Sequence, residues 1–252
     1  MDIKTFKQLG LDQAWDDLHV QSHKVNGRSN AEILEVLDTA GDAHYHPCAE
    51  AYARDGVPSG EVLSFKNWDQ SSVFANTRRD IWVYKSSGAD VAECLNLMVF
   101  NDGAGYLGRN GSVRATTVLD NLFNAGELAP TLGIFINPGL PPNAERPTRL
   151  AQRQHSLEYD SCHDLYLRFL VDEIVPFVAR ELNVLVSDNP ADRTICGISS
   201  GGACAFNAAW HGPEHFGRVI SHCGSFTNIR GAHNYPYLIR SSPRKAIKVF
   251  LQ

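Results

Sequence analysis

Short apolar runs alternate with longer segments of helical periodicity from about residue 60 onward. Two early runs read as strands that enter a sheet antiparallel, and four later runs read as buried strands: residues 61–65, 79–84, 95–100, 131–137, 193–196 and 218–223. Helices are predicted over residues 116–125, 163–182 and 202–210. Strands that alternate with helices predict an α/β fold, with a mostly parallel sheet, helices on both faces and hence a three-layer sandwich.

The two ends of the chain are less regular. Residues 1–57 carry little pattern apart from a helix predicted at 29–37, where Ser29 and Glu32 have the spacing of a capping box. We therefore expect an N-terminal extension or lid, partly helical, over residues 1–57 and an α/β domain over residues 58–252. Residues 248–252 have the pattern of a buried strand. Because the sequence stops within this pattern, we expect the domain to be incomplete at its C-terminus.

The length and the net charge of the chain indicate which kinds of binding partner can be excluded. The chain has 252 residues, enough for one α/β domain with a large core, and a formal net charge of −5. This acidic balance, without a run of Lys or Arg, argues against a nucleic-acid partner. No apolar stretch approaches the length of a membrane span, so no membrane partner is expected. The first residues also lack the apolar core of a signal peptide.

The cysteines and histidines do not predict a metal site. No C-x-x-C sequence occurs, and no Cys/His cluster has the spacing of zinc ligands. His44, His46 and Cys48 lie close together, and we interpret them as loop residues rather than as an isolated trio of ligands. The six cysteines are too sparse for a disulfide scaffold, so we expect most of them to be reduced and buried. No cofactor is predicted.

A glycine-rich run gives the strongest indication of chemistry. Residues 197–201 read G-I-S-S-G and match G-x-S-x-G, the pattern of a sharp strand-to-helix turn that exposes a serine at its tip. A strand is predicted before this run and a helix of small residues after it. A side chain two residues before or after the serine would collide with a neighbouring strand or helix, which explains the glycines. Ser199 is therefore the candidate nucleophile, and a glycine-rich turn without chemistry is the alternative.

The residues after Ser199 do not complete a catalytic triad. Turns of this type take their triad in the chain order Ser, then Asp or Glu, then His. Beyond Ser199 there is no Asp, and the single carboxylate is Glu214. It follows the helix at the edge of the sheet opposite the serine, where a solvated turn residue is expected. His233, on a loop that leaves the carboxyl end of a strand, is the candidate substitute base.

Five motifs follow one another in a defined order. They are V-F-N-D-G-A-G-Y at residues 99–106, F-I-N-P-G at 135–139, E-Y-D at 158–160, G-I-S-S-G-G at 197–202 and S-H-C-G-S-F at 221–226. Together they resemble the putative esterase family of α/β-hydrolases, which includes enterochelin esterases, esterase D, feruloyl esterases and mycolyltransferases. The resemblance covers about residue 58 to the end and is closest to bacterial enterochelin-esterase-like hydrolases. It implies an α/β-hydrolase fold and a serine carboxylesterase-type hydrolase that acts on a small-molecule ester.

The resemblance also implies roles for individual residues. Ser199 would attack an ester carbonyl, and the backbone N–H groups of Ser200 and Ala104 would hold the oxyanion. Asp102 is expected to brace its loop rather than to act as a base. The residues expected beside the substrate are Asp102, Gly103, Glu158, Tyr159, Asn228 and Arg230. Arg230 would face an anionic or catecholate substrate together with Arg149 and Arg153, unless all three are ordinary surface arginines.

Three functions are compatible with these patterns. The first is ester hydrolysis by a fragment of a longer enzyme, the second is a non-catalytic binding module, and the third is acyl transfer to an alcohol or sugar. In the family, the acid and the histidine would lie beyond Gln252. We therefore expect the 252-residue chain to have little esterase activity, about a thousandfold or more below that of a longer chain. The sequence does not decide whether the protein forms a homodimer. It also leaves two compartments as alternatives: the bacterial cytoplasm or, for a chain whose leader has been removed, the periplasm or the exterior of the cell.

Overall fold

Seven of the described strands form one mixed sheet in a computed structural model that describes residues 24–25, 28–29, 47–144 and 148–252. These strands are β3 (Glu61–Trp68), β4 (Arg79–Lys85), β5 (Asn96–Asn101), β6 (Thr131–Ile136), β7 (Arg193–Ile198), β8 (Arg218–His222) and β9 (Lys248–Leu251). Their order is β3-β4-β6-β5-β7-β8-β9, with β4 antiparallel to both neighbours and every other adjacent pair parallel. The predicted sheet is confirmed. Separately, β1 (Lys24–Val25) and β2 (Arg28–Ser29) pair antiparallel.

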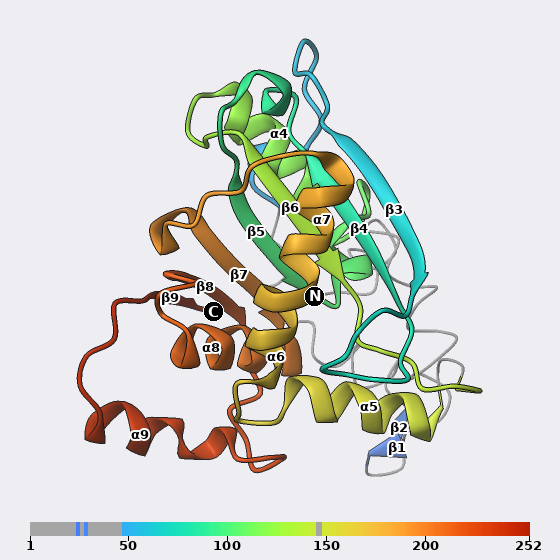
Figure 1. Ribbon diagram of the computed structural model, residues 1–252, viewed down its shortest axis with the longest axis vertical. Coiled ribbons are helices and arrows are strands. Elements are labelled where there is room, and N and C mark those ends of the chain that lie inside the picture. The colour runs from blue at the N-terminus through green and yellow to red at the C-terminus, as the bar shows by residue number, and fades with distance from the viewer. Residues whose placement is uncertain (1–23, 26–27, 30–46, 145–147) are drawn as a thin grey trace.

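Helices cover both faces of the seven-stranded sheet (Figure 1). One face carries α4 (Ala115–Asn124). The other carries α8 (Ser200–His211) and a long helical segment composed of α6 (Leu165–Arg168), the π-helical η5 (Phe169–Ile174) and α7 (Val175–Leu182). Among the described residues, the remaining helices are α5 (Arg149–Tyr159) and α9 (Tyr235–Ser241), and the short turns are η2 (Ala49–Ala51), η3 (Ala89–Val91), η4 (Gly103–Tyr106), η6 (Pro190–Asp192) and η7 (Ala232–Asn234). This is the three-layer arrangement that the sequence predicts.

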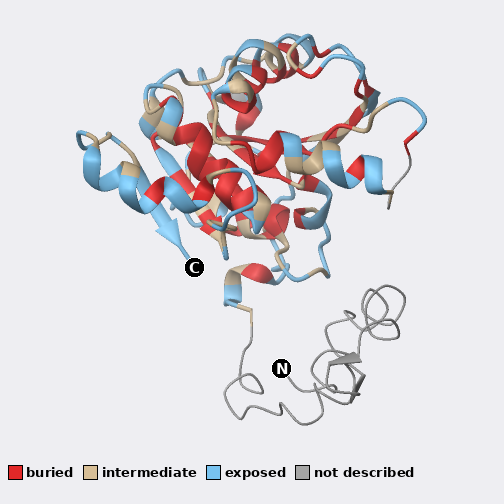
Figure 2. Ribbon diagram, turned by 90° about the horizontal axis from the view of Figure 1, so that it is seen from below, coloured by how far each residue is buried: buried red, intermediate tan, exposed pale blue. Residues whose placement is uncertain are grey.

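The core divides into two apolar clusters because successive side chains of a strand point to opposite faces. In β5, Leu97 and Val99 pack with the α6–α8 layer, whereas Phe100 packs on the α4 side and stacks on Phe135. Figure 2 shows the buried residues gathered in the central strands and the helices against them. Full burial of a side chain of this size stabilises the fold by about 1.5–3 kcal/mol.

Two helices and one helical irregularity differ from the prediction. Neither α5 nor α9 was expected, and the helix predicted over residues 163–182 is interrupted by the π-helical turn η5. The sequence pattern does not predict α5 because of the composition of this helix. Its buried side chains include Glu158 and Tyr159, so it lacks a continuous apolar stripe.

Two expectations about burial are wrong. β9 is the edge strand of the sheet and all four of its residues are exposed, because only β8 pairs with it. Among the cysteines, Cys196 and Cys204 are buried and Cys162 is half-buried, whereas the other three are exposed. All six cysteines have free thiols.

The N-terminal region is described only in part. Asn121 on α4 donates hydrogen bonds from Nδ2 to the carbonyl oxygens of Glu50 and Tyr52, at 2.7 and 2.8 Å, so residues around η2 pack on α4. Residues 30–46, which include most of the helix predicted at 29–37 together with His44 and His46, lie outside the described residues. The domain boundary at residue 58 stays a prediction. No helix within the described ranges combines the length and the apolar character that a membrane crossing requires.

Candidate active site

Ser199 forms the turn between β7 and α8. It follows Ile198, the last residue of β7, and precedes Ser200, the first residue of α8. Its backbone has φ 56° and ψ −120°, and a non-glycine residue in such a sparsely populated region costs roughly 1–3 kcal/mol. The Ser199 side chain makes no capping hydrogen bond to α8. Ser199 is exposed at the tip of this strained turn, at the carboxyl ends of the parallel strands.

Close backbone approaches explain the glycines on either side of Ser199. A Cβ atom on Gly197 would lie 2.2 Å from the carbonyl oxygen of Gly201, and one on Gly201 would lie 3.2 Å from Cβ of Asn101. Asn101, the last residue of β5, donates from Nδ2 to the Gly201 carbonyl over 3.0 Å. The turn therefore packs against the end of β5.

The end of β8 provides the other side of the turn. The Ser199 amide donates to the carbonyl oxygen of His222 over 2.9 Å, and the Ser225 amide donates to the Ser199 carbonyl over 2.9 Å. The hydroxyl oxygens of Ser199 and Ser225 are 2.9 Å apart. Burial lowers the pKa of the His222 imidazole, so this ring is neutral near pH 7.

A second loop leaves β5 next to the Ser199 turn, because β5 and β7 are adjacent and parallel. Asp102 starts it in the left-handed region, with φ 53°. The Ala104 amide donates to Oδ1 of Asn137 over 3.2 Å. The Ser200 amide lies in the first turn of α8, where N–H groups have no intrahelical acceptor. One predicted oxyanion donor thus lies in the loop after β5 and the other in the first turn of α8, and their convergence on one point stays a prediction.

Helix α5 contacts the Asp102 turn with two side chains. Nε2 of His155 lies 3.1 Å from Oδ2 of Asp102. A carboxylate only accepts hydrogen bonds, so His155 is the donor. The hydroxyl of Tyr159 accepts from the Asp102 amide at 3.0 Å and donates to the Ile136 carbonyl at 3.3 Å. Burial raises the pKa of Tyr159 well above its usual range, which keeps this hydroxyl protonated.

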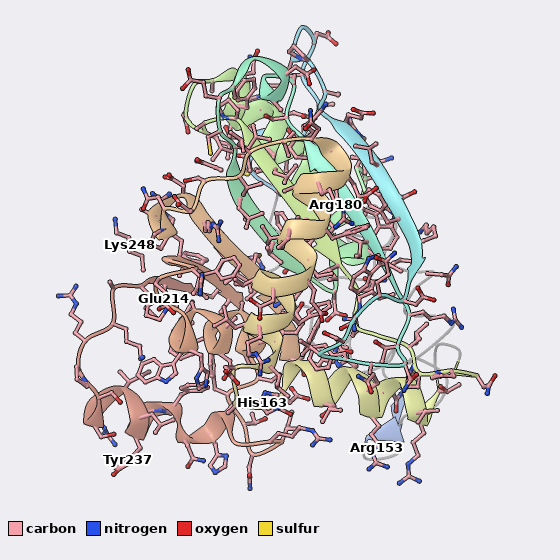
Figure 3. The ribbon with its side chains drawn as sticks, in the orientation of Figure 1. Arg153, His163, Arg180, Glu214, Tyr237 and Lys248 are labelled. Carbon is pink, nitrogen blue, oxygen red and sulfur yellow. The ribbon has the colours of Figure 1, made fainter. Side chains whose placement is uncertain are left out.

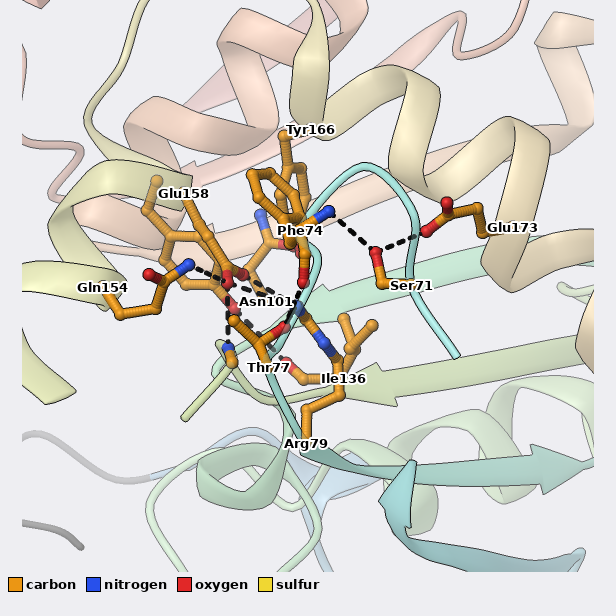
Figure 4. Close-up of polar contacts among 12 residues, drawn as sticks. Ser71, Phe74, Thr77, Arg79, Asn101, Ile136, Gln154, Glu158, Tyr166 and Glu173 are labelled. Carbon is orange, nitrogen blue, oxygen red and sulfur yellow. Dashed lines mark hydrogen bonds and ion pairs between the residues drawn. The ribbon is translucent and has the colours of Figure 1, made fainter. Parts of the chain in front are cut away.

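Glu158 lies in a buried ion pair beneath α5. Its oxygens are 2.7 and 3.1 Å from the guanidinium nitrogens of Arg79, and both side chains are fully buried. One of these oxygens also accepts from the amide of Gly139 and from Nε2 of Gln154 (Figure 4). A carboxylate engaged in this way offers no acceptor to a ligand at the surface. Its observed contacts fix α5 to β4 and to the loop after β6.

The loop after β8 carries the remaining predicted residues. Asn228, Arg230 and His233 are all exposed, with His233 in η7. Nε of Arg230 donates to Oγ of Ser156 on α5 over 3.1 Å, so this loop reaches the helix that holds the Asp102 turn. Arg153 is exposed on the outer side of the same helix (Figure 3).

Glu214 lies away from this edge, as predicted. It is in the turn between α8 and β8, at the amino end of β8, and therefore across the sheet from Ser199 (Figure 3). Its Oε1 is 3.7 Å from Nε2 of His215. Within the described ranges, no group of three or more His, Cys, Asp or Glu side chains is arranged to hold a metal ion.

Three residues near Ser199 or the Asp102 loop were not singled out from the sequence. Ser225 and Asn137 belong to two of the five motifs, so the sequence pattern included both residues but assigned neither of them a role. His155 belongs to none of them. Its contact with Asp102 joins residues 53 positions apart, and local patterns carry no information about such a pair.

Comparison with known proteins gives a family match. The family model described as "Putative esterase" matches residues 71–232. Two curated relatives are iron(III) enterobactin esterases. The one from Dickeya dadantii (strain 3937) is 28% identical over 169 residues, which are 67% of this chain and 34% of the relative. The one from Escherichia coli (strain K12) is 27% identical over 212 residues, which are 84% of this chain and 46% of the relative. The chain thus spans between a third and a half of these relatives.

A solved structure supports the fold. The enterobactin esterase FES from Shigella flexneri, crystallised in the presence of enterobactin, superimposes with a TM-score of 0.59 at 20% identity. The match covers 81% of this chain and 48% of that chain. The mixed sheet with helices on both faces is therefore the fold of esterases of the α/β-hydrolase type.

Proposed function

This chain belongs to the putative esterase family, and on that premise we propose that it hydrolyses carboxylic esters through an acyl-enzyme on Ser199. The observation that carries the proposal is the position of Ser199. Its hydroxyl is exposed at a strained turn between a central parallel strand and a helix, next to the loop after β5 and the first turn of α8, which carry the proposed backbone donors. Strain of this kind is found at functional sites more often than elsewhere.

The proposed reaction has two steps. In the first, Oγ of Ser199 forms a bond to the ester carbonyl carbon, the carbon–oxygen ester bond breaks, and the alcohol leaves with the proton that Ser199 gives up. In the second, water attacks the acyl carbon, the acid is released and Ser199 regains a proton. The amides of Ser200 and Ala104 are the proposed donors to the oxyanion of both tetrahedral intermediates. Because the Ala104 amide is bonded to Asn137 Oδ1, the oxyanion replaces that acceptor.

The proton needs an acceptor, because a serine without a base is a poor nucleophile at neutral pH. His233 stays the candidate from the sequence, and its exposed position in η7 leaves its ring open to solvent. The hydroxyl of Ser225 lies 2.9 Å from the hydroxyl of Ser199. We propose that it orients Ser199 rather than replaces the base, since a neutral hydroxyl is a weak proton acceptor.

The proposed substrate is a carboxylic ester that carries catecholate or other anionic groups, in keeping with the similarity to iron(III) enterobactin esterases. Besides the family, the support is electrostatic. Arg230 is exposed on the loop that contacts α5, and Arg149 is exposed at the start of α5, whereas Arg153 lies on the outer side of this helix. Guanidinium groups favour anionic oxygens over neutral ones.

Hydrolysis of a small chromogenic ester by the wild-type chain, by Ser199→Ala and by Ser242→Ala tests the function. We expect a low rate in the wild type and in the control serine variant, and the background rate in Ser199→Ala. Mass spectrometry of the acid-quenched reaction would show the acyl group on the peptide that contains Ser199. Equal rates in the wild type and in Ser199→Ala, with no acylated peptide, would contradict the proposal and favour a binding module.

A further inference from the structure

We infer that His155 and Tyr159 are positioning residues for the oxyanion loop, defined here as residues 102–106. This inference rests on the proposed function and extends it to α5, which the five sequence motifs reach only at its last residues. Neither side chain is proposed to touch the reacting atoms. Both are proposed to act on them through the Asp102 turn, which sets the direction of the Ala104 amide.

The Asp102 turn needs support from outside the loop. Asp102 has a left-handed backbone with φ 53°, which a residue with a side chain adopts only when its surroundings determine it. Gly103 follows with no room for a side chain, since a Cβ there would lie 2.3 Å from the carbonyl carbon of Phe135. The loop therefore has one conformation that fits against β6, and that conformation begins with a strained residue.

Helix α5 supplies this support from two residues one turn apart. His155 and Tyr159 stand at positions i and i+4, which place both side chains on one face of the helix. His155 donates to the Asp102 carboxylate at 3.1 Å, and Tyr159 accepts from the Asp102 amide at 3.0 Å. Their rings contact each other, with centroids 4.8 Å apart. One residue of the loop is thus held by its side chain and by its backbone at once.

The helix that makes these contacts is itself fixed. Glu158, between the two residues, forms the fully buried ion pair with Arg79. Tyr159 also donates to the Ile136 carbonyl at the end of β6. Since α5 is tied to β4 and β6 in this way, it provides a rigid reference for the loop rather than moving with it.

The charge on Asp102 gives the His155 contact a second consequence. Oδ2 of Asp102 is 3.6 Å from the position of a Cβ atom built on Gly201, so the carboxylate lies against the first turn of α8. This is the region in which the proposed reaction develops an oxyanion. The N–H of His155 donates a hydrogen bond to that same Oδ2, which partly compensates its negative charge and so reduces its repulsion with the oxyanion.

The test uses steady-state kinetics with the chromogenic ester. We expect His155→Ala to lower kcat about tenfold with KM unchanged, less than the roughly 100- to 1,000-fold cost of removing an oxyanion donor. His155→Gln keeps an N–H donor at similar reach and should recover most of the rate. His215→Ala is the matched control, because it removes a histidine–carboxylate contact at the opposite edge of the sheet. It should leave kcat within about twofold of the wild type, as expected for a site remote from the chemistry.

Amide hydrogen exchange in the free protein provides a readout that requires no activity. His155→Ala should raise exchange at Asp102, Ala104 and Gly105 about tenfold, since local opening sets exchange rates, whereas His215→Ala should not. Unchanged exchange, or a loss of rate that lies in KM, would overturn the inference even if the wild type hydrolyses esters. If the wild type shows no Ser199-dependent hydrolysis, the proposed function fails, and exchange alone decides whether His155 holds the loop.

Discussion

The hydroxyl oxygens of Ser199 and Ser225 lie within hydrogen-bonding distance, and the backbones of the same two residues are joined by a second hydrogen bond. Ser225 is thus fixed by its amide and in turn fixes the rotamer of the exposed serine. This restraint comes from the loop after β8, not from α8. The direction of the Ser199 hydroxyl therefore depends on the neighbouring strand of the sheet.

Removing the Ser225 hydroxyl should lower turnover without weakening substrate binding. A neutral hydrogen bond contributes about 0.5–1.5 kcal/mol, so we expect Ser225→Ala to reduce kcat by about three- to tenfold at constant KM. Ser225→Thr keeps a hydroxyl and should restore the rate. A kcat for Ser225→Ala equal to that of the wild type would show that the contact does not orient Ser199.

Breaking the buried ion pair should destabilise the whole domain. Arg79→Met leaves the Glu158 carboxylate buried without its partner, and we expect a loss of about 3–5 kcal/mol in the free energy of unfolding. Urea unfolding followed by circular dichroism measures this loss. The control is Arg54→Met, which removes an exposed pair with Glu50 at 3.0 Å and should leave the free energy of unfolding almost unchanged, because solvent screens such pairs. Similar losses in both variants would mean that the buried pair contributes nothing beyond an ordinary surface pair.

Two glycines of one loop should respond differently to the same substitution. A Cβ on Gly103 would meet the backbone of Phe135, whereas one on Gly105 has no atom within 4 Å. We expect Gly103→Ala to cost about 1–3 kcal/mol of stability, as overpacking does, and to reduce Ser199-dependent hydrolysis. Gly105→Ala should change neither. Thermal unfolding and ester hydrolysis of the pair test this, and equal behaviour of the two variants would be the contrary result.

Glu173 should give the protein a pH-dependent increment of stability. Burial raises the pKa of this carboxyl, but hydrogen bonds from Ser71 and Ser72 and from the amides of Ser72 and Val73 outweigh it, so the pKa lies below its ordinary value of 4.5. A lowered pKa in the folded state stabilises the protein above the unfolded pKa, and the gain is lost as the pH falls through the folded value.

Glu173→Gln should therefore lose about 1–3 kcal/mol at pH 7, as for hydrogen bonds to a charged group. The difference from the wild type should shrink as the pH falls below 4.5. Urea unfolding at pH 7, 5 and 3 gives the comparison. Asp172→Asn is the control, because the side chain of Asp172 is 61% exposed and its ion pair with Arg168 is long, at 4.0 Å. A difference that does not vary with pH would exclude the carboxylate as its source.

The sequence predicts the fold well because the relevant signals are local. Apolar runs of strand length and the helices between them give the parallel sheet, and a glycine pattern with the correct flanks places Ser199 at a strand-to-helix turn. Helix α5 was not predicted by this reasoning. Its buried Glu158 is satisfied by Arg79, which lies 79 positions earlier in the chain. A buried charge looks like a surface residue until its partner is known.

In the candidate site, too, local features were predicted and contacts between distant residues were not. The strand-to-helix turn is one contiguous motif, whereas the contacts of Asp102 with His155 and of Ala104 with Asn137 span 53 and 33 positions.

The π-helical turn η5 has an evolutionary consequence. A π-helical turn corresponds to the insertion of one residue into an α-helix. Deleting one residue between α6 and α7 would restore a regular helix and rotate one half relative to the other by about 100°, the angle per residue of an α-helix. At present α6 directs the Tyr166 hydroxyl to Asn101 at the end of β5, while α7 packs Phe177 against Phe65 and Trp68. A single-codon deletion in this segment would therefore keep one of these contacts and lose the other.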